Sequence, residues 1–155
     1  MSKTDDRQSD AQSTSTGPSD VSLADRFEIA ELLARYSRSI DSGAADEWAG
    51  LFTTDGEFRN RRGDSWVGTE RLREFAVEYA ADPRYKASAH WTNNVILEPL
   101  GEDIRLFCHG MILQTVGDST VIRSMSAYDD LIRKERGGWR FARRHVQPWP
   151  PVPAE

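Results

Sequence analysis

The chain has 155 residues, a formal net charge of −5 and an isoelectric point near 5.3. This length suits one domain with a substantial core, and the acidic balance argues against a general nucleic-acid-binding protein. Cys108 is the only cysteine, which excludes an intrachain disulfide and fits a reducing compartment, and no apolar run reaches the roughly 18 residues that a membrane span needs.

The first 20 residues contain almost no apolar side chains. They lack the apolar core of a secretion signal and are too acidic for an organelle transit peptide, so we expect a cytoplasmic protein. Because little apolar surface is present to offset the entropy of ordering, residues 1–20 are predicted to form a disordered tail.

A strong amphipathic helix follows, with Ser22 and Asp25 resembling a capping box and Gly43 expected to stop it. Asp41 is unusual in the last turn, because the C-terminal end of a helix carries partial negative charge. A carboxylate there needs a positive or hydrogen-donating partner. The residues expected to form the buried stripe recur at helical spacing: Ile29, Leu32, Leu33, Tyr36 and Ile40.

The next forty residues mix helix, turn and strand signals. The expected order is a short helix around Trp48, a turn at 54–56, strands at 57–60 and 65–68, and a third helix that Thr69 caps and that ends at Asp82 before Pro83. The residues of this helix expected to face inward are Leu72, Phe75, Ala76 and Tyr79.

Everything after the third helix is predicted to be strand, because turns at 101–102, 117–118 and 137–138 favour hairpins. Three N-terminal helices on a strongly curved, mostly antiparallel sheet make an α+β fold, with the domain at 21–147. A proline-rich tail at 148–155 cannot continue a central strand. The expected strands are 87–100, 103–116, 119–135 and 138–147.

If each hairpin has a two-residue loop, strand pairing can be counted from the turns. Asn94 then faces His109, His109 faces Ser126, and Asp130 faces His145. Burying an unpartnered polar group costs about 1–3 kcal/mol, so a polar cluster on one face is typical of a ligand cavity, although a β-bulge would reverse part of the assignment. The face so defined carries His90, Thr92, Asn94, Phe107, His109, Ser126, Tyr128, Asp130, Phe141, Arg143 and His145.

Three stretches resemble the SnoaL-like group of the nuclear transport factor 2-like superfamily in order and spacing: EIAELLARYSRSIDSGAADEWAGLFTTDGEF, SAHWTNNVILEP and SAYDDLIRKERGGWRFARR. The resemblance implies a cone-shaped α+β barrel. Members such as scytalone dehydratase, hexachlorocyclohexane dehydrochlorinase and bile-acid 7α-dehydratase use a His–Asp pair in a pocket. The matching positions are Asp41 and His90, and Tyr36 matches a tyrosine five residues before the aspartate.

The resemblance also has departures. Ketosteroid isomerase places an aspartate general base where this chain has Asn60, which cannot abstract a proton. The bile-acid enzyme has a pocket arginine late in its chain, and the nearest substitute in this sequence is Arg143 or Arg144. The HWTNNV segment resembles β subunits of ring-hydroxylating dioxygenases, whose role is largely assembly.

The implied chemistry is proton transfer, in which His90 takes a proton and Asp41 accepts the hydrogen on the other ring nitrogen. Tyr36 or Tyr128 would hydrogen-bond the developing oxyanion, and no metal or organic cofactor is needed. Aromatic walls from Trp48, Phe58, Trp66, Phe107 and Phe141 favour a hydrophobic ring substrate. The candidate substrate-binding residues are Asn94, His109, Tyr128, Arg143, Trp66 and Phe58.

We therefore expect a cofactor-independent lyase or isomerase of the dehydratase or cyclase type, forming a homodimer or homotrimer through its outer sheet face, with no nucleic-acid or membrane partner. The alternative is a non-catalytic ligand-binding or assembly subunit, such as a dioxygenase β-subunit-like protein. Plainer roles also stay open: Asp41 in a turn, His90 bonded to backbone, Tyr36 in the core, and the three histidines as a zinc site.

Overall fold

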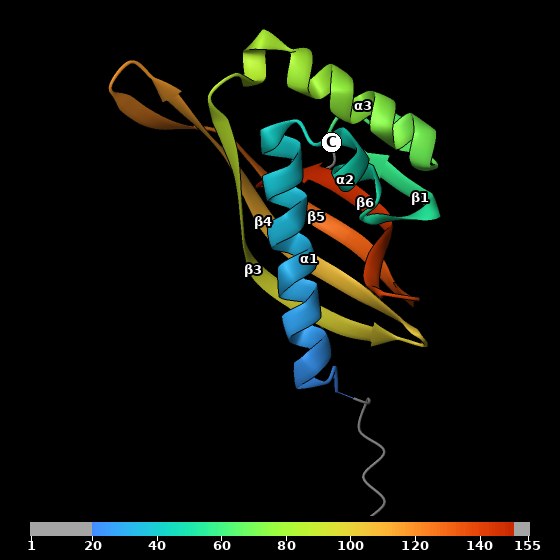
Figure 1. Cartoon of the computed structure of the whole chain (residues 1–155). Coiled ribbons are helices and arrows are strands. Elements are labelled where there is room, and N and C mark those ends of the chain that lie inside the picture. Colours follow the sequence, from blue (N-terminus) through green and yellow to red (C-terminus); the bar gives the residue numbers. More distant parts are fainter. Residues whose placement is uncertain (1–19, 151–155) are drawn as a thin grey trace, which may run out of the picture.

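The computed structural model describes residues 20–150. The expected N-terminal tail therefore lies almost wholly outside the described residues, as do the last five residues of the proline-rich tail. The described chain forms three helices and a six-stranded sheet, so the predicted α+β class is confirmed. In Figure 1, α1 and α2 lie across one face of the sheet, and α3 packs over one end of it.

Three α-helices and one 3₁₀ turn make up the helical part: α1 (Leu23–Ser42), α2 (Ala45–Ala49), α3 (Thr69–Ala81) and η1 (Pro83–Tyr85). The ends of α1 are as predicted. The Ser22 side chain accepts a hydrogen bond from the Asp25 amide, and Gly43 takes the left-handed conformation that closes the helix, with φ of 73°. None of the described helices is long and apolar enough to span a bilayer.

The six strands are β1 (Phe52–Arg59), β2 (Ser65–Val67), β3 (Ser88–Leu100), β4 (Asp103–Val116), β5 (Ser119–Glu135) and β6 (Gly138–Pro148). Their order in the sheet is β2-β1-β6-β5-β4-β3. Neighbours run antiparallel except β1 and β6, which run parallel, so the sheet is mixed. The four-strand meander of β3 to β6 matches the predicted strands within one residue at each end.

The turn predicted at residues 54–56 is wrong, because these residues lie inside β1. Gly56 instead lets the backbone of β1 pack closely against Phe141 and Phe52. A Cβ at this position would lie 2.9 Å from the Phe141 carbonyl oxygen and 2.9 Å from the Phe52 Cβ. The predicted cap at Thr69 is also wrong, since α3 begins after Gly68 without a side-chain cap.

The predicted register of the meander is wrong in its middle, because each pair of strands contains a β-bulge. In β3, Asn94 has φ of 55° within an irregular segment, so Asn93 pairs with His109. Between β4 and β5 the irregularity puts Ala127 opposite His109. A bulge adds one residue to one strand, which moves every later side chain to the opposite face.

The last hairpin differs from prediction twice. Glu135 pairs with Gly138, which shifts the turn by one residue, and a second irregularity follows between Leu131 and Ile132. As a result Asp130 pairs with Arg144 rather than with His145. These shifts decide which polar side chains point under the helices.

The core lies between the helices and the inner face of the sheet. Its centre is aromatic: Trp48 packs 4.9 Å from Phe52 and 5.5 Å from Tyr36, and Phe141 lies 5.6 Å from Tyr36, measured between ring centroids. Trp48 and Phe141 are fully buried, so they support the cavity from behind rather than forming its wall.

Candidate active site

The carboxylate at the end of α1 meets the histidine near the start of β3. The backbone N–H of His90 donates to one Asp41 oxygen at 2.8 Å, and the His90 Nδ1 lies 2.6 Å from the other. The two side chains are 9% and 20% exposed, for His90 and Asp41 respectively. The backbone and ring donors supply the partner that a helix-end carboxylate requires.

This contact fixes the orientation of the imidazole. An ionised carboxylate only accepts hydrogen bonds, so the Nδ1 of a neutral His90 carries the hydrogen and Nε2 keeps a free lone pair. A ring held in this tautomer is arranged to take a proton through Nε2.

His90 forms part of the wall of a cavity of about 460 Å³. The cavity lies between α3, the β1–β2 turn and the inner face of β4 and β5. Its deeper wall is largely aromatic, whereas arginines gather among its more exposed lining residues. The aromatic residues of the lining are Tyr36, Phe58, Trp66, Phe75, Tyr79, Tyr85 and Tyr128.

Tyr36 is buried beside His90, with the two rings edge to face at 6.5 Å between centroids. Burial raises the pKa of Tyr36 well above its usual range, so the hydroxyl stays protonated. The Tyr36 side chain both lines the cavity and belongs to the aromatic core, so the two roles expected for it from the sequence coexist.

Arg144, not Arg143, is the arginine that β6 directs inward. Its guanidinium carbon lies 4.1 Å from the Tyr36 ring centroid and 4.0 Å from that of Tyr128, so it is held between two aromatic faces. Arg143 is partly exposed and lies 3.9 Å from Asp129. The bulge between β5 and β6 is the reason that Arg144, and not Arg143, points inward.

Arg144 forms a fully buried ion pair with Asp130, at 3.1 Å. Burial raises the pKa of the Asp130 carboxyl to about 7, although the charge of Arg144 opposes this change. Burial lowers the pKa of Arg144, but the charge of Asp130 together with the nearby Tyr36, Cys108 and Tyr128 more than offsets this, so the guanidinium stays charged. A charged group therefore lies directly behind the two tyrosines of the cavity wall.

Tyr79 lines the cavity, whereas its sequence position predicted only a place in the apolar stripe of the third helix. Its ring lies 5.9 Å from that of His90, and its hydroxyl is buried without a hydrogen-bond partner among residues 20–150. Burial raises the pKa of this hydroxyl, so it stays a donor. The helical period correctly placed the ring inward, but periodicity does not reveal whether a hydroxyl is satisfied.

Three of the six expected substrate-binding residues line the cavity, namely Phe58, Trp66 and Tyr128. The other three are placed away from it by the bulges. Asn94 is exposed and lies 3.1 Å from the Nδ1 of His109, and His109 packs against Trp149 on the outer face. Phe107, expected in the aromatic wall, lies under the guanidinium of Arg105 instead.

The three histidines do not converge. His90 bonds Asp41, His109 contacts Asn94, and His145 lies 3.1 Å from Glu57. Within residues 20–150, no group of three or more His, Cys, Asp or Glu side chains is arranged to hold a metal ion.

Asn60, at the place of the isomerase aspartate, builds a turn. Its side-chain oxygen accepts hydrogen bonds from the amides of Arg62 and Asp64, and its amide donates to the Asp64 carboxylate. Although Asn60 lines the cavity, its side chain is thus already occupied.

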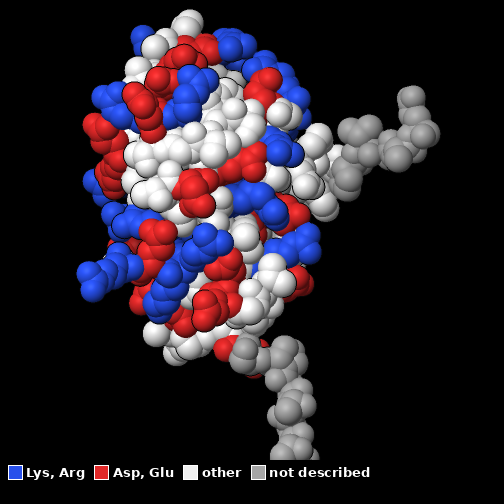
Figure 2. Space-filling model, turned by 90° about the vertical axis from the view of Figure 1, so that its right-hand side faces the viewer, with Lys and Arg blue, Asp and Glu red and all other residues white. Residues whose placement is uncertain are grey.

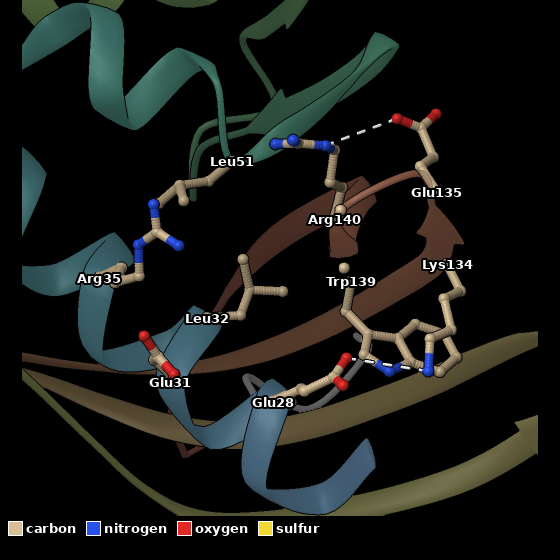
Figure 3. Close-up of a pocket in the computed structure, with 11 residues that line it drawn as sticks. Glu28, Glu31, Leu32, Arg35, Leu51, Lys134, Glu135, Trp139 and Arg140 are labelled. Atoms are coloured by element: carbon tan, nitrogen blue, oxygen red, sulfur yellow. Dashed lines mark ion pairs between the residues drawn. The ribbon is translucent and has the colours of Figure 1, made fainter. Parts of the chain in front are cut away.

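A second hollow of about 440 Å³ separates α1 from the β5–β6 hairpin. Figure 3 shows two ion pairs among its lining residues: Lys134 lies 3.8 Å from Glu28, and Arg140 lies 3.5 Å from Glu135. Lys134 also contacts Asp25, which lies outside the lining. Arg133 of the same hairpin is likewise paired, with Asp103 at 3.2 Å. On the face in Figure 2, basic and acidic side chains alternate around uncharged areas.

The family model of the SnoaL-like domain matches residues 21–145, which include Asp41 and His90. The chain belongs to the SnoaL-like domain family. This confirms the family suggested by the three sequence stretches. No curated protein is significantly similar to the chain.

Solved structures agree with this family. A Mycobacterium tuberculosis protein of unknown function is 28% identical with a TM-score of 0.72, covering 80% of this chain and 71% of its own. An NTF2-like protein with a cystatin-like fold from Novosphingobium aromaticivorans is 26% identical with a TM-score of 0.75, covering 84% and 85%. A candidate scytalone dehydratase from the same organism is 17% identical with a TM-score of 0.71, covering 84% and 97%, and shows the shared fold alone.

Proposed function

We propose that this SnoaL-like protein is a cofactor-independent lyase or isomerase of the dehydratase or cyclase type, acting on a hydrophobic ring compound. The observation that carries the proposal is the contact of Asp41 with His90 in the wall of an aromatic cavity. A candidate scytalone dehydratase has the same fold. Because one fold hosts many activities, the proposal rests on the site and not on that likeness.

In this proposal each group has a role. His90 takes a proton through Nε2, from a carbon next to a carbonyl or next to a leaving group. Asp41 holds the ring and stabilises the imidazolium once it forms. Tyr36 lies beside the histidine and can donate to the oxygen on which negative charge develops.

Arg144 acts on this site through the tyrosines it contacts. Its positive charge lies close behind the rings of Tyr36 and Tyr128 and favours partial negative charge at their hydroxyls. This makes both phenols stronger donors toward an oxyanion in the cavity.

A simple carbon acid tests the proposal without knowledge of the natural substrate. 2-Tetralone is a bicyclic ketone whose α-hydrogens exchange slowly in D₂O. We expect the protein to accelerate this exchange, followed by proton NMR, because His90 can remove an α-hydrogen. An exchange rate equal to that of buffer containing the same concentration of free imidazole would contradict the assignment of His90 as a base.

Tyr79→Phe is expected to lower the rate of such a reaction by about 10-fold or more, because Tyr79 lines the cavity beside His90 and its unpaired hydroxyl is proposed to donate to the substrate. The fold should be unaffected, since the lost hydroxyl has no partner among the described residues. Tyr85→Phe is the matched control, because Tyr85 stacks on Tyr79 at 4.1 Å, but only the Tyr79 ring is paired with the His90 ring. Equal rates for Tyr79→Phe and the parent would remove Tyr79 from the mechanism.

We also propose that the protein assembles as a homodimer or homotrimer through the outer sheet face. Trp91, Met111 and Met125 lie side by side across β3, β4 and β5, and Trp91 is 57% exposed. A contiguous exposed apolar row of this kind marks an interaction site, and an identical row on a second copy would complement it. Sedimentation equilibrium should show an oligomer that Trp91→Glu dissociates. A monomeric parent at micromolar concentration would refute the assembly.

A further inference from the structure

The exposed part of the catalytic cavity has a charge opposite to that of the whole chain. Among its lining residues are four arginines and two carboxylates, Glu78 and Asp82, which leaves an excess of two positive charges. The chain as a whole carries −5. The four arginines of the lining are Arg61, Arg62, Arg84 and Arg123.

Two of these arginines are already paired. Arg84 makes a forked contact with both carboxylate oxygens of Asp82, with its Nε at 3.0 and 2.9 Å, and this raises the pKa of Arg84. Arg62 contacts Asp64 at 3.2 Å within the β1–β2 turn. The charges of both guanidiniums are therefore largely compensated by the protein.

The other two arginines of the lining, Arg61 and Arg123, have no carboxylate within 4.0 Å among residues 20–150. Arg61 donates one hydrogen bond, to the Met125 carbonyl at 3.4 Å. Arg123 donates to the side-chain oxygen of Gln114 at 2.6 Å and lies 5.6 Å from the Tyr85 ring centroid. The charge of Arg123 lowers the pKa of Asp82 from a distance, but Arg84 holds that carboxylate.

The position of Arg123 follows from the bulge between β4 and β5. Ile112 pairs with Ser124 and Leu113 pairs with Ile122, so Arg123 is the extra residue that faces no partner. Regular alternation would put it on the outer face, opposite to the inward Ser124. A bulge re-aims a side chain, and this one brings a guanidinium into the cavity lining.

We propose that the ring substrate carries an anionic group, a carboxylate or a phosphate, which Arg61 and Arg123 bind while the ring enters the aromatic wall beside His90. This rests on the proposed function and names the class of substrate for the same site. Arginine suits such a role because its planar donors match both anions. The arginines come from the β1–β2 turn and from β5, so an anionic group between them would also orient the ring.

Direct binding tests the proposal independently of turnover. We use the full chain, with 2-naphthoate and 2-naphthyl phosphate as the anionic probes and 2-naphthamide as their neutral counterpart, followed by ligand fluorescence. Both anions should bind about 10-fold more tightly than the amide at low salt, and the difference should shrink as sodium chloride is added. The better of the two anions identifies which group the site prefers.

Variants then locate the anion. Arg61→Gln and Arg123→Gln should each weaken naphthoate binding about threefold to tenfold and leave naphthamide binding unchanged. Arg136→Gln is the matched control, because it removes an exposed arginine in the β5–β6 turn, away from the cavity lining. His90→Gln should keep the preference for anions.

Equal affinities for naphthoate and naphthamide would overturn the proposal. An equal loss of naphthoate affinity in Arg61→Gln and in Arg136→Gln would also overturn it. If none of the three probes bound at about 1 mM, the proposal would be overturned as well, because the lining would then not accept an aromatic anion. Failure of the proposed function has a different signature. It would leave anion selectivity intact while 2-tetralone exchange shows no dependence on His90.

Discussion

His90→Gln is expected to reduce catalysed exchange of 2-tetralone by about 10²–10⁴-fold, the contribution typical of a positioned acid–base group. Glutamine approximates the size of the imidazole and can still hydrogen-bond Asp41, but it cannot take up a proton near neutral pH. The reduction should appear in kcat, because the aromatic wall that binds the ring is unchanged. Proton NMR of the exchange reaction gives the rate for each variant.

His109→Gln is the matched control for this prediction. His109 lies on the outer face of β4 against Trp149, so its loss should leave the exchange rate within about twofold of the parent. If both variants reduced exchange equally, the effect would be structural rather than catalytic. If His90→Gln retained the parent rate, the base would have to be another group.

Asp130→Ala is expected to lower the free energy of unfolding by about 3–5 kcal/mol, because it leaves the guanidinium of Arg144 buried without its counter-charge. Chemical denaturation followed by tryptophan fluorescence measures this loss. Asp130→Asn keeps the shape of the side chain and serves as a milder variant if the alanine protein does not fold.

The matched control here is Asp103→Ala. It breaks an exposed ion pair with Arg133, at 3.2 Å, and should cost no more than about 1 kcal/mol. In Asp130→Ala with Arg144→Met, much of the lost stability should return, because the buried charge is removed. A loss below about 1 kcal/mol in Asp130→Ala alone would mean that another group compensates Arg144.

The elements of this fold were largely predictable because their signals are local. The capping residue Ser22 and the stop at Gly43 lie within one turn of the helix ends they define, and both act as expected. Glycine-containing turns likewise located the strands of the meander to within one residue. The contact of Asp41 with His90 was inferred from a misplaced charge together with a family resemblance, and the structure brings the two together.

The inward-facing residues of the late strands were less predictable, because one bulge changes the face of every residue beyond it. Asn94, His109 and Arg143 were expected in the cavity, and all three lie elsewhere. Sequence alternation cannot locate a bulge at a non-glycine residue such as Asn94, whose φ of 55° is uncommon for a residue with a side chain. Arg144 was therefore recognised only as an alternative to Arg143.

The sequence was least informative on whether a polar side chain already has a hydrogen-bond or ion-pair partner within the protein. Tyr79 and Tyr85 are both aromatic residues near the end of α3, and only the structure shows that the Tyr79 hydroxyl is buried without a partner. The same holds for arginines. Arg84 and Arg123 look alike in sequence, yet one is clamped by Asp82 and the other has no carboxylate partner in the described chain.

Nitrogen NMR of the His90 ring tests most directly whether the carboxylate ending α1 prepares the imidazole for proton transfer. In the parent protein at a pH where the ring is neutral, we expect Nδ1 to carry the hydrogen and Nε2 to be bare, and in Asp41→Asn we expect the preference to weaken or reverse. A parent spectrum with the hydrogen on Nε2, or one that Asp41→Asn leaves unchanged, would contradict proton abstraction by this pair.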